Sequence, residues 1–264
     1  FPTNNPGSDQ NGLLIYLTAS VGNNEPGFYY WDNTNSEWKS VTNTKNVWLI
    51  SGNNNTNPNN NYIGTKDNVD LIFKRNNNHS GIIASNNTSF GNNSYKPIGS
   101  STNNTAFGSF TLSNTTNGNS NTGIGFSVLK NNTTGYFNTA IGANSMLNNT
   151  IGNSNVALGI FSLSSNTVGN SNTSVGANSL KMNINGNENS SLGNNSLQNN
   201  TSGSYNVAIG THTLYSNTSG NNNTGIGSYT LTTNSTGNNN VAIGLASLSF
   251  NTIGNQNTAV GNNS

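Results

Sequence analysis

Side chains that could do acid–base, nucleophilic or metal chemistry are scarce in this 264-residue sequence. From position 87 to the end there are one carboxylate, one histidine and three lysines, namely Glu188, His212, Lys96, Lys130 and Lys181. Catalysis of any of these kinds needs several such groups close together. A lone histidine without a ligand motif is more often packed or solvated than bound to a metal. The sequence therefore predicts no enzyme, no metal site and no cofactor.

Other patterns that could bind a ligand fail on their context. Gly123-Ile124-Gly125 and Gly225-Ile226-Gly227 do not open a helix, so they do not cradle a phosphate. Calcium-binding β-rolls need an Asp in each turn, whereas these turns carry Asn and Thr. Four aromatic residues near the N-terminus could stack on sugars, but in so small a module we expect them to form its core. These are Tyr29, Tyr30, Trp31 and Trp38.

The composition excludes several classes of partner. Charged residues make up 6% of the chain and the net charge is +1, so no basic patch predicts nucleic acid or an anionic membrane as a partner. No apolar run is long enough to cross a bilayer. Hydrophobic residues reach only 30% and cysteine is absent, so neither a large apolar core nor disulfides can stabilise the fold. Stability must come from backbone pairing and association.

The elements that carry the few functional side chains follow from a strict internal repeat. A pentapeptide of the form Asn-x-small-apolar-Gly recurs at a constant interval without an insertion. Each repeat has seventeen positions, and its first Asn is counted here as position one. The copies begin at Asn87, Asn104, Asn121, Asn138, Asn155, Asn172, Asn189, Asn206, Asn223, Asn240 and Asn257. Position nine is apolar or aromatic, and a second Gly closes most units at position fifteen.

This pattern predicts a parallel β-solenoid with one coil per repeat, in which each unit has two short strands and two turns. Asn138 belongs to an axial ladder of amides, and Gly142, Gly152 and Gly169 lie in the turns. The apolar residues of positions four and nine are expected to form two columns of a thin core, buried in the roll or at a subunit interface. The columns are Ile141, Leu158, Val175 and Ile209, and Leu163, Leu180, Leu197 and Leu214.

The composition changes upstream of the repeats. We expect a small aromatic β-hairpin module over residues 1–50, a linker and short β adaptor over 51–86, and a β-roll of eleven repeats over 87–264, the last of them truncated as in a fragment. The strands expected before the array are Leu13 to Tyr16, Gly27 to Asp32 and Trp38 to Val41. Two or three further strands are expected between Tyr62 and Ile83, from the runs Tyr62 to Gly64, Val69 to Phe73 and Gly81 to Ile83.

The repeats carry a family resemblance. Asn138-Thr139-Ala140-Ile141-Gly142-Ala143-Asn144-Ser145 and Asn206-Val207-Ala208-Ile209-Gly210 resemble the head repeats of YadA-like trimeric autotransporter adhesins and similar arrays in trimeric phage tail fibres. The upstream modules look like segments that precede such arrays in surface fibre proteins of Bacteroidota and their phages. The resemblance implies a left-handed roll, a homotrimer and attachment to a surface. The head repeat of these adhesins is shorter than the repeat of this chain, so the cross-section here must differ.

Positions six and seven vary along the array and follow the Gly turn, so we expect them to form a rim-facing stripe. Its aromatic members could contact a cell-surface glycan or protein receptor, although a solvated turn would also tolerate them. They are Phe110, Phe126, Phe161, His212 and Tyr229.

The leading hypothesis is thus an extracellular, trimeric adhesin or fibre on a cell surface or virion, with a phage receptor-binding fibre as the alternative. A homotrimer is expected because one coil buries too little apolar surface to offset its ordering entropy. A third hypothesis is an ice-binding solenoid, based on the recurrence of Thr at position thirteen. These residues are Thr116, Thr133, Thr150, Thr167, Thr201, Thr218 and Thr252.

Overall fold

The computed structural model describes residues 12–21, 26–41, 62–96 and 99–264, and the chain divides into two compact units, Phe1–Gly64 and Thr65–Ser264. The regular elements of the described residues are all β-strands. Residues 51–61 of the expected linker and adaptor lie outside the described residues.

The first unit holds a three-stranded antiparallel sheet of β1 (Leu14–Leu17), β2 (Gly27–Asp32) and β3 (Glu37–Ser40) in that order. Alternation along β2 places Tyr29 and Trp31 on the buried face, where the Trp31 ring meets Trp38 edge to face at 5.5 Å. The side chain of Lys39 pairs with Asp32 across β2 and β3. This contact lowers the pKa of the Asp32 carboxyl to about 2.

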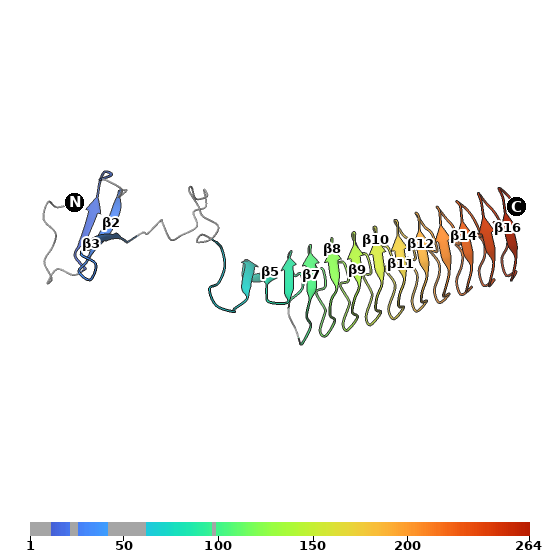
Figure 1. Ribbon diagram of the computed structural model, residues 1–264, viewed down its shortest axis with the longest axis horizontal. Helices are drawn as coiled ribbons and strands as arrows, with labels where there is room; N and C mark the ends of the chain where they lie inside the picture. Colours follow the sequence, from blue (N-terminus) through green and yellow to red (C-terminus); the bar gives the residue numbers. More distant parts are fainter. Residues whose placement is uncertain (1–11, 22–25, 42–61, 97–98) are drawn as a thin grey trace. The chain divides into compact units, whose positions relative to one another are not determined.

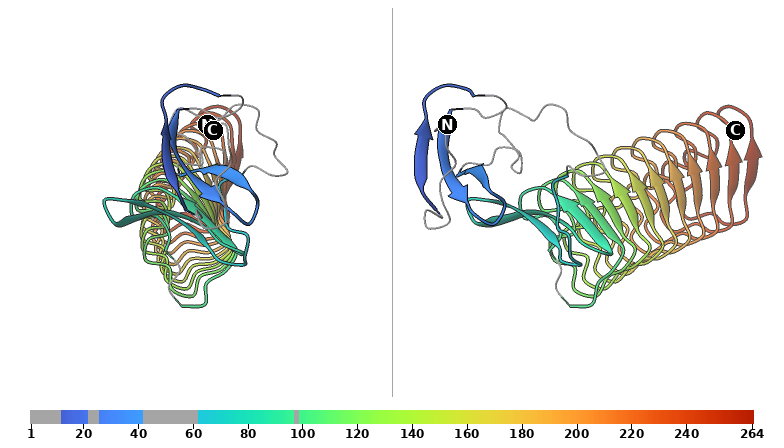
Figure 2. Two further views of the ribbon diagram at one scale, coloured as in Figure 1. Left: turned by 90° about the vertical axis from the view of Figure 1, so that its left-hand side faces the viewer. Right: turned by 60° about the vertical axis from the view of Figure 1, so that its left-hand side comes forward.

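The second unit is built on one sheet of thirteen strands, shown in Figures 1 and 2. Two antiparallel strands, β4 (Leu71–Arg75) and β5 (Asn78–Ile83), open it, and β5 pairs antiparallel with β6. The remaining strands are β6 (Asn87–Phe90), β7 (Asn104–Phe107), β8 (Thr122–Ile124), β9 (Thr139–Ile141), β10 (Val156–Leu158), β11 (Thr173–Val175), β12 (Ser190–Leu192), β13 (Val207–Ile209), β14 (Thr224–Ile226), β15 (Val241–Ile243) and β16 (Thr258–Val260). Of the two or three strands expected between Tyr62 and Ile83, two are formed, and Tyr62 to Gly64 is irregular and exposed.

From β6 to β16 each strand pairs in parallel with the next at a register of one repeat, as in Ala157 with Ser174. The prediction of a parallel solenoid with one coil per repeat of seventeen positions is therefore confirmed. The prediction of two strands per coil is wrong. Leu163, at position nine, has a φ of 51°, so this side of the coil is a turn. Its backbone nevertheless bonds from coil to coil, since Leu163 N–H donates to Ser179 O at 3.0 Å.

The core lies between the strand and position nine, and it is narrower than the sequence suggested. Leu163 and its equivalents from Tyr95 to Leu231 are buried, as are Ala157 and the other small residues of position three up to Ala242. Ile141, at position four, is 39% exposed. The expectation that position four belongs to the core of the roll is therefore wrong. Strand side chains alternate, so an inward position three forces positions two and four outward.

Two ladders of asparagine amides run through the interior. At position one, Asn138 Nδ2 donates to Asn121 Oδ1 at 3.1 Å and to Gly152 O at 2.8 Å, and the same pattern recurs from coil to coil. The second ladder, at position twelve, was not expected from the sequence. There Asn166 Nδ2 donates to Asn149 Oδ1 at 2.8 Å and to Gly169 O at 3.0 Å. Both ladders are fully buried over most of their length.

The two regularly spaced glycines of each coil serve different purposes. Gly142, at position five, has a φ of 117°, a left-handed conformation that other residues rarely adopt. Gly152, at position fifteen, has no such conformation. A Cβ there would lie 2.4 Å from Asn149 Oδ1 and 2.5 Å from Gly169 O. The absence of a Cβ at Gly152 therefore leaves room for the side chain of Asn149, which donates a hydrogen bond to Gly152 O.

Candidate ligand-contact surfaces

The stripe expected at positions six and seven lies on the turn that follows each strand. Phe126 occupies position six and is exposed, whereas Phe110, Phe161 and His212 occupy position seven and are half-buried. Tyr229, also at position seven, is exposed. The structure thus places all five side chains on this rim, but it does not bring them into one continuous cluster.

The rim residues form three separate groups. The first joins Phe110 and Phe126, whose ring centroids are 6.0 Å apart, with Lys130 Nζ 5.4 Å from the Phe110 ring. The second pairs Phe161 with Lys181 at 5.2 Å. In the third, the His212 ring stacks parallel to Tyr229 at 5.3 Å, and its Nε2 lies 3.2 Å from Asn195 Nδ2. Aromatic faces beside a cation are able to stack on sugars or on partner side chains.

The backbone at position seven makes these aromatic residues unusual. Phe110, Phe161 and Tyr229 have φ values of 59°, 54° and 57°, a left-handed conformation that is unfavourable for bulky side chains. Several other coils place Asn here, which tolerates this conformation well. These are Asn93, Asn144, Asn178, Asn195 and Asn263.

A second surface is the outward face of the strands. Positions two and four point away from the core, and position four carries an exposed or half-buried apolar residue in every coil. Position two carries Thr, Val or Ser, so the face contains no charge. Ile124, Ile141, Ile209 and Ile226 are among its exposed members. A continuous apolar column of this kind is typical of a surface that packs against a partner.

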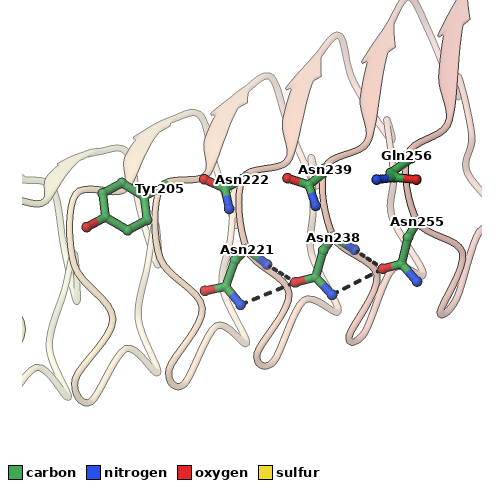
Figure 3. Close-up of a pocket in the computed structure, with 7 residues that line it drawn as sticks. All are labelled: Tyr205, Asn221, Asn222, Asn238, Asn239, Asn255 and Gln256. Carbon is green, nitrogen blue, oxygen red and sulfur yellow. Dashed lines mark hydrogen bonds between the residues drawn. The ribbon is translucent and has the colours of Figure 1, made fainter.

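A third surface is a shelf formed by positions sixteen and seventeen, at the turn that precedes each strand (Figure 3). The inner row consists of hydrogen-bonded amides: Asn221 Nδ2 donates to Asn238 Oδ1 at 3.2 Å, and Asn238 Nδ2 donates to Asn255 Oδ1 at 3.1 Å. The outer row is exposed, and within the described residues its amides make no side-chain hydrogen bond. It consists of Tyr205, Asn222, Asn239 and Gln256.

This shelf was not expected from the sequence. The available signal was an unbroken run of larger polar side chains at position seventeen from Glu188 onward, whereas the earlier copies are mixed and include Phe137. Ser154 and Ser171 precede the acidic Glu188, and Tyr205, Asn222, Asn239 and Gln256 follow it.

The threonines of position thirteen are engaged within the solenoid. Thr150 Oγ1 donates to Thr167 O at 2.9 Å, and Thr167 Oγ1 donates to Ile184 O at 3.2 Å. The same bond to the next coil recurs along the column. Because these hydroxyl protons are already donated to the backbone, the column offers little to an ice lattice.

Titratable groups remain dispersed. Across residues 12–21, 26–41, 62–96 and 99–264, no three His, Cys, Asp or Glu side chains gather into a group able to hold a metal ion. Within the same ranges, no helix is long and apolar enough to cross a membrane. The chain matches no family model, no curated protein and no solved structure. The surfaces themselves must therefore indicate the function.

Proposed function

We propose that this chain is a non-catalytic segment of an extracellular fibre, that it works as a homotrimer, and that it attaches its owner to a surface. The observation that carries the proposal is the strand face of positions two and four. Every coil presents it in the same orientation, without a charge and with an apolar side chain. An array that repeats one surface many times is suited to assembly and to multivalent attachment.

The strand face favours association with further copies of the same chain. Each coil encloses little more than the residues of positions three and nine, such as Ala157 and Leu163, between its ladders. This interior offers limited apolar burial against the entropy lost when a whole coil is ordered. Packing the position-four columns of three chains around a common axis would bury Ile141, Ile209 and their equivalents, and it would bring no charges together.

The rim aromatic residues are the proposed contacts with a cell-surface glycan or protein receptor, since Phe126 and Tyr229 are exposed and Phe110 and Phe161 each have a lysine beside the ring. A fibre on a bacterial cell and a fibre on a virion would use the same architecture. Antibody labelling of intact cells and of purified phage particles separates these owners, because only one of the two should carry the chain on its surface.

Attachment can be tested with purified chain on a glycan array and on a panel of cells. Replacing Phe110, Phe161 and Tyr229 together by Ser should leave the fold intact, because these residues are outside the core. If the rim makes the contact, binding should fall at least about tenfold, as expected when central aromatic contacts are lost.

Phe250→Ser is the matched control, since Phe250 is 90% exposed but lies on another side of the coil. Binding that survives the triple replacement would make the rim a passive part of a shaft and move recognition to another surface of the chain. A folded chain that attached to nothing in either panel would contradict the proposal of an adhesin.

A further inference from the structure

The outer row of the shelf repeats once per coil. Tyr205, Asn222, Asn239 and Gln256 occupy position seventeen of four successive coils, whose spacing is set by parallel strand pairing at about 4.8 Å. All four have a left-handed φ between 56° and 61°. Their side chains therefore leave the backbone in the same way, and Figure 3 shows them as a row along the array.

The inner row holds this arrangement in place. Asn221 N–H donates to Asn238 Oδ1 at 2.8 Å, and Asn238 N–H donates to Asn255 Oδ1 at 2.7 Å. The backbone immediately before Asn222 and Asn239 is therefore fixed to the next coil. The outer amides retain both their N–H donors and their carbonyl acceptor for a ligand. The fixed backbone lowers the part of the entropic cost of binding that belongs to the main chain.

The chemistry of the row fits hydroxyl groups rather than charges. An amide can donate to one oxygen of a sugar and accept from another, and the exposed ring of Tyr205 can stack on a pyranose face. No cation lies in the row, and the next residue in the column is Glu188, whose carboxylate would repel an acidic chain. Phosphate, nucleic acid and acidic polysaccharides are therefore poor ligands for this surface.

The spacing between successive residues of the row matches the length of a sugar unit. One coil advances about 4.8 Å, which is close to the length of one pyranose in an extended β-linked chain. We infer that the shelf binds an extended, uncharged polysaccharide that runs parallel to the solenoid axis, with about one sugar per coil. This inference rests on the proposed attachment function and names a ligand class and a site for it.

The test is calorimetric titration of the whole chain with soluble β-1,4-linked glucose and N-acetylglucosamine oligomers, from the dimer to the hexamer. Affinity should rise with each added sugar up to about the tetramer, because four coils carry the row, and then level off. The triple variant Asn222→Gly, Asn239→Gly and Gln256→Gly should bind the tetramer at least about tenfold more weakly. Glycine removes the amides and accepts the left-handed backbone.

The matched control is Ser120→Gly, Ser154→Gly and Ser171→Gly, three substitutions in the same column with φ values of 56° to 57°. This control should bind the oligomers like the original chain. Circular dichroism and the mass in solution of both triple variants must equal those of the original chain. A change of mass confined to the amide variant would assign the shelf to a subunit interface and overturn the inference.

The inference is also overturned if no oligomer binds, if the amide variant binds as well as the control, or if hyaluronan oligomers bind better than neutral ones. The attachment assay separates these results from failure of the proposed function. A chain that attaches to cells equally well with and without the outer amides remains an adhesin, but its ligand is not held on this shelf.

Discussion

The interior of this protein is stabilised by amide side chains where other proteins use apolar ones. Asn172 shows the arrangement: its Nδ2 donates to Asn155 Oδ1 at 3.1 Å and to Gly186 O at 2.9 Å. Its own Oδ1 accepts from the backbone and the side chain of Asn189, each at 3.0 Å. Each buried amide is thus satisfied on all sides. A charged residue could not be stacked in this way without self-repulsion.

Removing the side chain of one asparagine from the position-one ladder should lower the stability of the array. Asn172→Ala would leave the backbone N–H of Asn189 in the next coil without its acceptor, and one unsatisfied buried group costs about 1–3 kcal/mol. We expect a clear decrease in the midpoint of thermal unfolding followed by circular dichroism, and faster cleavage by protease near the altered coil.

Asn194→Ala is the control, because Asn194 lies exposed at position six of a neighbouring coil. Its unfolding midpoint should stay close to that of the original chain. Equal destabilisation by the two substitutions would show that the buried ladder adds nothing beyond an ordinary surface amide.

At the scale of the coil, a good part of the architecture could be predicted from the sequence. The unbroken period gave the coil length, and Gly142 and Leu163 stand where a turn and a core residue were expected. Position four was misassigned because an apolar identity was taken as a sign of burial. The small residue at position three was the better indicator, since a Cβ on Gly123 would lie 2.6 Å from Thr111 Cγ2 in the crowded interior.

Other features were hidden for physical reasons. The residues around a buried Asn at position twelve look like those around an exposed Asn in a turn. Asn149 differs from a turn Asn only in that it recurs in each coil with a Gly three residues later. Leu163 and Phe161 adopt left-handed backbones that residue type does not predict. The shelf depends on which amides are already bonded, and that follows from the stacking of coils rather than from the order of residues.

Because position nine faces the core and position four faces outward, truncating the two side chains should reduce the stability of the coil by very different amounts. Leu163→Ala removes a fully buried side chain and should destabilise the array by about 2–5 kcal/mol. Ile141→Ala removes an outward side chain and should change the unfolding of a single chain by much less. Denaturant unfolding in dilute solution, below the concentration at which chains associate, measures both.

Leu163→Met is a suitable control because it keeps the volume of the core, and it should cost less than about 1.5 kcal/mol. A larger loss of stability from Ile141→Ala than from Leu163→Ala, measured on the dissociated chain, would mean that the two sides of the coil have been exchanged.

For the molecule as a whole, the central claim is that the strand faces of three chains pack together. The array has few charged residues that could bind a partner by electrostatic attraction. It has an outward-facing apolar column that runs along the strands from β6 to β16 and could pack against a partner. Lysine at position four would place a charge at the proposed axis of the trimer, where desolvation and like-charge repulsion both oppose assembly. The fold of each coil should tolerate that change, because the position faces outward.

Sedimentation equilibrium at micromolar concentration tests this claim most directly. The original chain should have three times its monomer mass of 27.6 kDa. The double variant Ile141→Lys and Ile209→Lys should sediment at the monomer mass. The control with Ile151→Lys and Ile184→Lys, two exposed isoleucines outside the strand face, should remain a trimer. A stable, folded monomer of the original chain, or a double variant that still assembles into trimers, would contradict the account.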